Sequence, residues 1–236
     1  MSSPIPVTLV GATGLTGKST LLSLFSSSIP FSITTFARRS IPLTTPTNPQ
    51  IKWEQKERPD LFSVVNEKVG EKMGVFVSCL GTTIAQAGGM EKQKKIDLDL
   101  NRDLAKKAKE DGVSTYILVS STGSDSSSWF HYTKMKGQLE DAVKEIGFDH
   151  CIILRPALLL GDRGYTRKTE FLVTKTIRAY LSLGGPGSSM LAIDSDDVGA
   201  CIAHLAANPP TEKVITLSNS EMIQIAAKHR AATASS

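Results

Sequence analysis

The sequence predicts a doubly wound α/β fold, with a mainly parallel sheet and helices on both faces. Short apolar runs alternate with stretches of helical periodicity along the 236-residue chain, and this alternation is typical of parallel strands joined by crossover helices. Most runs are nearly continuous in apolar or β-branched residues, as expected for strands covered on both faces. The predicted strands are Val7–Val10, Ser32–Phe36, Ile51–Trp53, Val75–Cys79, Thr115–Val119, Cys151–Leu154 and Val214–Leu217.

Two stretches between these strands carry an apolar stripe at helical spacing, with charged residues on the opposite side. The stripes consist of Ile96, Leu100, Leu104 and Ala108, and of Met135, Leu139, Val143 and Ile146. Residues Arg39–Gln50 include three prolines and read as an exposed loop. We expect a single domain over residues 1–230 and a flexible tail over residues 231–236.

The composition is that of an ordinary globular protein, with 40% apolar residues, 21% charged residues and a net charge of +4. No stripe of lysine and arginine with interleaved aromatics predicts nucleic-acid binding. The apolar runs are too short to span a bilayer, and we expect neither a secretory signal nor a cleaved organelle presequence. Cys79, Cys151 and Cys201 lack metal-ligand spacing, so we expect buried, reduced thiols and no metal site.

The most informative motif follows the first predicted strand, where Gly11, Gly14 and Gly17 recur at three-residue spacing. Glycines let the backbone turn tightly and approach a ligand closely, and the following helix offers unpaired N–H groups to an anion. This pattern is a variant of the dinucleotide-binding fingerprint. We expect Thr13, Leu15 and Thr16 to line the same phosphate site.

Two other interpretations of this segment remain open. Ala12–Ser19 lies within one residue of a triphosphate-binding loop, in which Lys18 would contact the phosphates and Ser19 would hold magnesium. That site also needs an acidic ligand at the end of a strand, and none of the later predicted strands ends in aspartate. The segment could also be a tight connection with no ligand.

Arg38 and Arg39 follow the second predicted strand, about 20 positions beyond the glycines. An acidic residue there binds the ribose 2′-hydroxyl of NAD, whereas arginine accommodates the 2′-phosphate of NADP. The pair therefore favours NADP, although two arginines that open a loop can also be solvated surface residues.

Tyr132 and Lys136 stand four residues apart, which places both side chains on one face of a helix. A nearby ammonium favours the phenolate form, which suits a tyrosine that acts as acid or base. Ser121 follows the strand Thr115–Val119, at the edge of the sheet where ligands bind, and could hydrogen-bond a substrate carbonyl. Alternatively, Tyr132 and Lys136 lie on an ordinary amphipathic helix, and Ser121 is a turn or helix-capping serine.

Two more loops point to the same edge of the sheet. The small residues of Cys79–Thr83 would let a cofactor pass beside Leu80 and Gly81, and Arg155-Pro156 ends a later strand. We expect His131 to be a surface residue. Substrate specificity would come from the loops Gly161–Lys175 and Gly184–Ser189.

Taken together, these motifs resemble the short-chain dehydrogenase/reductase superfamily in its atypical or extended branch. The segments that carry the resemblance are Gly11–Gly17, Cys79–Thr83, Val119–Ser121, Tyr132–Lys136 and Ile153–Pro156. They are most similar to the fungal Found-in-Mitochondrial-Proteome family, which has an animal relative in the Tat-interacting oxidoreductase. The resemblance covers nearly the whole chain.

The resemblance implies a Rossmann-like fold, NADPH binding and peripheral attachment to the cytosolic side of the mitochondrial outer membrane; the cytoplasm is the alternative location. It implies that Arg38 and Arg39 contact the 2′-phosphate, that Tyr132 donates a proton and that Lys136 binds the nicotinamide ribose. Ser121 would polarise the carbonyl. Asn101 is the one position where the superfamily's fourth catalytic residue could lie.

We therefore expect an NADPH-dependent oxidoreductase of the carbonyl reductase type, acting on a small molecule. The alternatives are an NADPH-binding regulatory protein without physiological turnover and an ATPase with a triphosphate-binding loop.

Overall fold

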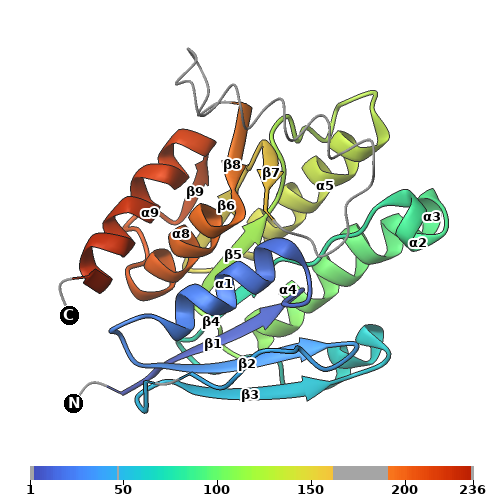
Figure 1. Cartoon of the computed structure of the whole chain (residues 1–236). Coiled ribbons are helices and arrows are strands. Elements are labelled where there is room, and N and C mark those ends of the chain that lie inside the picture. The colour runs from blue at the N-terminus through green and yellow to red at the C-terminus, as the bar shows by residue number, and fades with distance from the viewer. Residues whose placement is uncertain (1–2, 47, 162–190, 235–236) are drawn as a thin grey trace.

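The computed structural model describes residues 3–46, 48–161 and 191–234, and it confirms the doubly wound α/β fold (Figure 1). Seven parallel strands form the main sheet in the order β3-β2-β1-β4-β5-β6-β9. They are β1 (Ile5–Val10), β2 (Phe31–Ala37), β3 (Lys52–Glu57), β4 (Val75–Ser78), β5 (Thr115–Val119), β6 (His150–Leu154) and β9 (Val214–Leu217). The strand order reverses between β1 and β4, which is where open α/β sheets bind ligands.

Helices cover both faces of this sheet (Figure 1). One face is covered by α1 (Leu15–Phe25), α8 (Ser195–Ala207) and α9 (Asn219–Ala234), and the other by α4 (Asn101–Glu110) and α5 (His131–Ile146). Shorter helical segments are the 3-10 helix η1 (Leu61–Asn66), α2 (Ile84–Ala87), α3 (Met90–Lys94) and the π-helical η2 (Lys95–Leu100).

The continuous apolar runs of the central strands are explained by two hydrophobic cores. Val77 and Ile117 pack into the core beneath α1 and α8, whereas their chain neighbours Phe76 and Tyr116 pack into the core beneath α4 and α5. Because side chains alternate between the faces of a strand, burial on both sides requires an apolar residue at nearly every position.

Several details differ from the sequence predictions. The edge strand β3 extends through Glu57, beyond the predicted end at Trp53, because charged side chains are tolerated on an edge strand. The short parallel pair β7 (Leu158–Leu160) and β8 (Ala192–Asp194) was not predicted.

Two further segments differ from their predictions. Helix α9 continues through Ala234, so four residues of the expected tail are helical. The loop over 39–50 has no regular structure in its described residues, but Ile41 is buried in the core rather than exposed. The expected specificity loops lie, beyond Gly161, outside the described residues.

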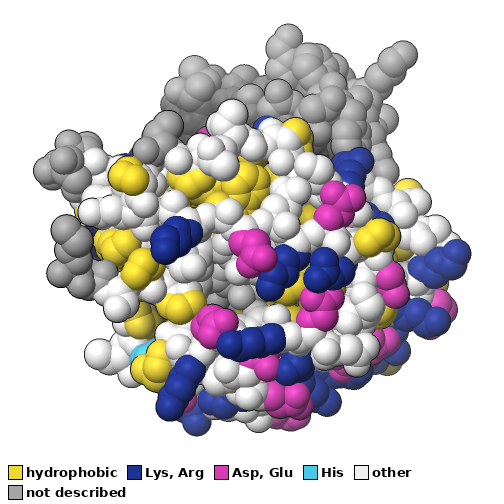
Figure 2. All heavy atoms as spheres, turned by 90° about the horizontal axis from the view of Figure 1, so that it is seen from below, with side chains coloured by type: hydrophobic (Ala, Val, Ile, Leu, Met, Phe, Trp, Pro, Cys, Tyr) yellow, Lys and Arg dark blue, Asp and Glu magenta, His cyan; other side chains and the backbone are white. Residues whose placement is uncertain are grey.

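On the face of the molecule seen from below, Lys and Arg side chains are interspersed with Asp and Glu side chains (Figure 2). Among the described residues, no helix is long and apolar enough to cross a membrane. All three cysteines are free thiols. Cys151 and Cys201 are buried and Cys79 is half-buried.

Candidate functional site

The loop after β1 brings the backbones of β1, β4 and α1 into close contact. Gly11 has φ +82°, a conformation that glycine adopts readily. A Cβ on Gly11 would lie 2.4 Å from the carbonyl oxygen of Cys79, and a Cβ on Gly17 would lie 2.2 Å from that of Gly11. A Cβ on Gly14 would keep 3.3 Å from the same oxygen of Gly11. Gly11 and Gly17 are therefore required by packing, and Gly14 is less tightly enclosed.

The first turn of α1 is open to an anion. Gly14 is the N-cap, and the turn has neither a side-chain cap nor an acidic residue. The N–H groups of Leu15, Thr16 and Gly17 have no partner within the helix, and the helix dipole favours negative charge at this end. Thr13 and Gly14 are exposed. The loop therefore fits a phosphate group.

The two residues specific to the triphosphate interpretation lie in different surroundings. Lys18 is exposed, whereas Ser19 is buried against the start of α8. The hydroxyl of Ser19 donates to Asp196 Oδ1 at 2.7 Å and lies 3.1 Å from the Ser195 hydroxyl. Ser19 thus links α1 to α8, and the geometry favours the dinucleotide interpretation.

Arg38 and Arg39 follow β2, which is the neighbour of β1 in the sheet. Both are exposed, and neither has an ion-pair partner among the described residues. Arg58, at the end of β3, is different, because it forms two hydrogen bonds of 2.5 and 2.7 Å with Glu67. The charges of Arg38 and Arg39 are therefore available to a ligand.

Leu80 and Gly81 lie in the loop after β4, and Asn101 holds that loop in place. Asn101 is fully buried. Its amide nitrogen donates to the carbonyl oxygens of Leu80, at 3.3 Å, and Ile96, at 3.2 Å, and its oxygen accepts from the Ser78 hydroxyl at 2.5 Å. Its polar atoms are thus engaged with the protein itself.

Lys136 reaches the same loop from α5. It is only 4% exposed, and it forms no hydrogen bond or ion pair with another described residue. A Cβ on Gly81 would lie 3.8 Å from Lys136 Nζ and 3.7 Å from Asp97 Oδ2. The N–H donors of this ammonium are therefore available to a hydroxyl of a ligand.

Tyr132 lies in the first turn of α5 and is 42% exposed, four residues before Lys136. Ser121, in the loop after β5, is half-buried, and its hydroxyl makes a single long contact of 3.4 Å within the described chain, to the carbonyl of Thr122. Within the described residues neither hydroxyl has a strong hydrogen bond, so both can bind a ligand. His131 is exposed, as predicted.

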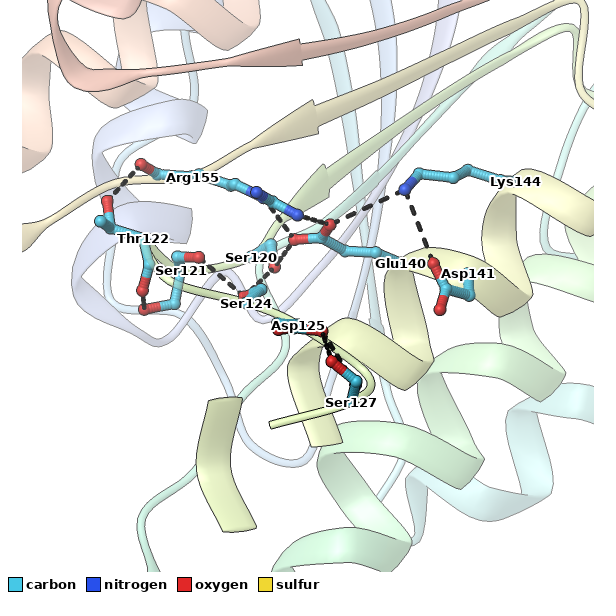
Figure 3. Close-up of polar contacts among 10 residues, drawn as sticks. All are labelled: Ser120, Ser121, Thr122, Ser124, Asp125, Ser127, Glu140, Asp141, Lys144 and Arg155. Atoms are coloured by element: carbon cyan, nitrogen blue, oxygen red, sulfur yellow. Dashed lines mark hydrogen bonds and ion pairs between the residues drawn. The ribbon is translucent and has the colours of Figure 1, made fainter. Parts of the chain in front are cut away.

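A network of polar side chains fixes the loop that carries Ser121 (Figure 3). The carboxylate of Glu140, which is 1% exposed, accepts from the Ser120 hydroxyl at 2.5 Å and from two nitrogens of Arg155 at 3.0 and 2.6 Å. These hydrogen bonds hold the pKa of Arg155 above its usual value. Ser124 donates to the backbone carbonyl of Ser121 at 2.7 Å. The network therefore joins the ends of β5 and β6 to α5.

The same loop packs closely onto α5. A Cβ on Gly137 would lie 2.1 Å from the backbone nitrogen of Ser126, and the N–H of Asp125 donates to the carbonyl of Thr133 at 3.1 Å. The segment that carries Ser121 is thus fixed against the helix that carries Tyr132.

Three further residues of this region were not predicted from the sequence: Asp97, Gly137 and Glu140. Two of them left a signal, since Asp97 and Glu140 are acidic residues on otherwise buried helix faces, spaced four residues from Asn101 and Lys136 respectively. Gly137 left no signal, because its neighbour Ser126 comes close only in the folded chain.

Comparison with known proteins supports a nicotinamide cofactor. A family model described as NAD(P)H-binding matches residues 11–209. The chain is 40% identical over 166 residues to "Protein fmp52, mitochondrial" of Emericella nidulans, covering 70% of this chain and 71% of that protein. It is 34% identical over 222 residues to "Protein FMP52, mitochondrial" of Candida albicans, covering 92% of this chain and 96% of that protein.

A solved structure supports the fold. The 3-oxoacyl-[acyl-carrier protein] reductase from Brucella melitensis, determined in complex with NAD, superposes with a TM-score of 0.64. The match covers 94% of this chain and 99% of that one, at 16% identity. The shared architecture is Rossmann-like.

Proposed function

Because this chain belongs to the FMP52 family of atypical short-chain dehydrogenase/reductase proteins, we propose that it is an NADPH-dependent reductase of a small carbonyl compound. The observation that carries the proposal is the buried ammonium of Lys136. It lies over Gly81, in the loop whose backbone packs on the glycine turn. In this proposal, one face of the site would combine a loop that binds phosphate with a cation that contacts a ribose.

The described residues fit a nicotinamide cofactor. The first-turn N–H groups of α1 would hold its diphosphate, and Lys136 would contact the nicotinamide ribose. Arg38 and Arg39 support NADPH over NADH, because two exposed guanidinium groups at the end of β2, with no ion-pair partner in the described part of the chain, suit a 2′-phosphate. A bound NADPH would supply a hydride.

The protein's own residues would orient the substrate and supply the proton. Ser121 would donate a hydrogen bond to the carbonyl oxygen of the substrate, and Tyr132 would give that oxygen a proton as the alkoxide develops. The positive charge of Lys136, one helical turn away, would favour release of that proton.

The substitution Tyr132→Phe tests this role, because it removes one hydroxyl from a largely open position. We expect turnover of aldehydes or ketones to fall at least about 100-fold while NADPH binding changes little. Tyr116→Phe is the matched control, because Tyr116 stacks between Phe76 and Phe148 in the core. Full biological activity of the Tyr132 variant would instead favour an NADPH-binding regulatory protein without turnover.

We further propose that the protein associates peripherally with the mitochondrial outer membrane and faces the cytosol. The proposal is supported by the two relatives described above, which are both named as mitochondrial. In fractionated cells, the protein should sediment with mitochondria, be released by alkaline carbonate and be digested by protease added to intact organelles. Recovery in the cytosol would contradict it.

A further inference from the structure

Asp97 is a buried carboxylate at the floor of the site. It is 1% exposed and lies on the π-helical turn η2, between α3 and α4. Burial of a carboxylate is costly unless another group compensates its charge, and π-helical turns occur often at functional sites. The position of Asp97 therefore calls for a partner.

The contacts of Asp97 point to Lys136 as that partner. Asp97 Oδ1 accepts a hydrogen bond from the N–H of Thr82 at 2.8 Å, so the other oxygen is directed elsewhere. A Cβ on Gly81 would lie 3.7 Å from Asp97 Oδ2 and 3.8 Å from Lys136 Nζ. The carboxylate and the ammonium thus border the same small space beside Gly81, and their attraction acts across it without a direct ion pair.

The other charged groups nearby do not compete for Asp97. From α4, Arg102 pairs with Asp99 at 3.5 Å and with Asp103 at 3.1 Å. Asn101, also from α4, and Gln93, from α3, are uncharged. Among the described residues, Lys136 from α5 is the cation whose charge acts on Asp97.

We propose that Asp97 is a positioning residue for Lys136, whose carboxylate holds the ammonium over Gly81 where it would meet the nicotinamide ribose. The proposal rests on the proposed function for the identity of the ligand. The attraction between Asp97 and Lys136 is a property of the protein alone and can be tested without any ligand.

The proposal implies a dependence on pH. Burial raises the pKa of Asp97 from 3.8 to about 6, against the opposing effects of the Lys136 charge and the Thr82 N–H. A carboxyl with a raised pKa in the folded state stabilises the fold fully below its unfolded value, and this contribution is lost as the pH rises through the folded value. At pH 7.5 the carboxylate is charged and depends on Lys136. At pH 5 it is mostly neutral and does not.

The first experiment is a double-mutant cycle on thermal unfolding, with Asp97→Asn and Lys136→Met. At pH 7.5, Lys136→Met removes the charge that favours the Asp97 carboxylate, so the buried group must either stay charged without compensation or take up a proton. Both cost free energy, and we expect the melting temperature to fall by several degrees. In the Asp97→Asn background the same change should have little effect, and at pH 5 the difference between the backgrounds should vanish. Asp99→Asn is the matched control background and should behave as wild type.

The second experiment measures NADPH dissociation constants from pH 5 to pH 8. We expect Asp97→Asn to weaken binding about tenfold at pH 7.5 and to approach wild type at pH 5. Comparison of variant with wild type at each pH cancels the titration of the cofactor's own phosphate. Asp99→Asn should follow wild type throughout.

Each outcome decides the proposal. A cycle with no coupling at pH 7.5, or with coupling that persists at pH 5, overturns it, as does equal NADPH affinity for the Asp97 and Asp99 variants. If Asp97→Asn does not fold, the fall in melting temperature caused by Lys136→Met alone must appear at pH 7.5 and disappear at pH 5. If wild type binds no NADPH, the proposed function fails, and the cycle still decides whether Asp97 holds Lys136.

Discussion

The two halves of the sheet's ligand-binding edge are built in different ways. Around β1 and β4, the backbone itself forms the site, and Gly11 and Gly17 leave room for direct contact between main-chain segments. Around β5 and β6, side chains form the support, with Glu140, Arg155 and Ser124 bonded across the loop that carries Ser121 (Figure 3). The first half would hold the part of the ligand common to all dinucleotides, and the second would hold the reacting groups.

We expect the greatest loss of stability around β1 and β4, where the backbone itself forms the site. Gly17→Ala places a Cβ 2.2 Å from the carbonyl oxygen of Gly11, and neither backbone segment can move without disturbing the packing of β1 on β4. We expect the free energy of unfolding in urea to fall by about 3 kcal/mol or more. Gly14→Ala is the control, since its Cβ would keep 3.3 Å from the same oxygen; a loss as large as that of Gly17→Ala would contradict the distinction between the two glycines.

We expect an intermediate loss of stability around β5 and β6, where side chains support the loop that carries Ser121. Glu140→Ala leaves Arg155 and the Ser120 hydroxyl without their buried acceptor. Because the Arg155 side chain is 34% exposed and can be partly rehydrated, we expect a loss of about 2 kcal/mol in urea unfolding, less than for a fully buried pair. Glu145→Ala, an exposed position on the same helix, should stay within about 0.5 kcal/mol of wild type. Equal losses in the two variants would mean that the network adds no stability.

The smallest effect is expected for the Ser124 hydroxyl. Ser124→Ala removes its hydrogen bond to the Ser121 carbonyl, at 2.7 Å, and its 3.1 Å contact with the Ser120 hydroxyl, while Ser120 keeps its hydrogen bond to Glu140. We expect a loss of about 1 kcal/mol in thermal or urea unfolding, with the loop after β5 exchanging amide hydrogens faster than in wild type. Ser127→Ala is the control, because it removes a hydrogen bond of the same length, to Asp125 Oδ1 at 2.7 Å, in the exposed part of the same loop. Unchanged exchange in the Ser124 variant would rule out this fixing role.

The same difference explains what could be predicted from the sequence. The glycine turn, the seven main strands and the two arginines depend on local patterns, so their positions could be read from neighbouring residues. Other features depend on how distant segments pack: the ion pair of Glu140 with Arg155, the contact of Gly137 with Ser126 and the position of Asp97 beside Lys136. Strands β7 and β8 escaped prediction for a similar reason, because each is three residues long and stabilised by the other.

We have proposed that the glycine turn and the paired arginines form an NADPH site, and a thermal-shift comparison of NADPH, NADH and magnesium ATP tests this claim. We predict the largest rise in melting temperature with NADPH, a smaller rise with NADH and none with magnesium ATP, since a ligand that binds the folded state stabilises it according to its affinity. Replacing both Arg38 and Arg39 with glutamine should remove the advantage of NADPH over NADH. A rise with magnesium ATP but not with NADPH, or an equal rise with NADH in wild type, would contradict the claim.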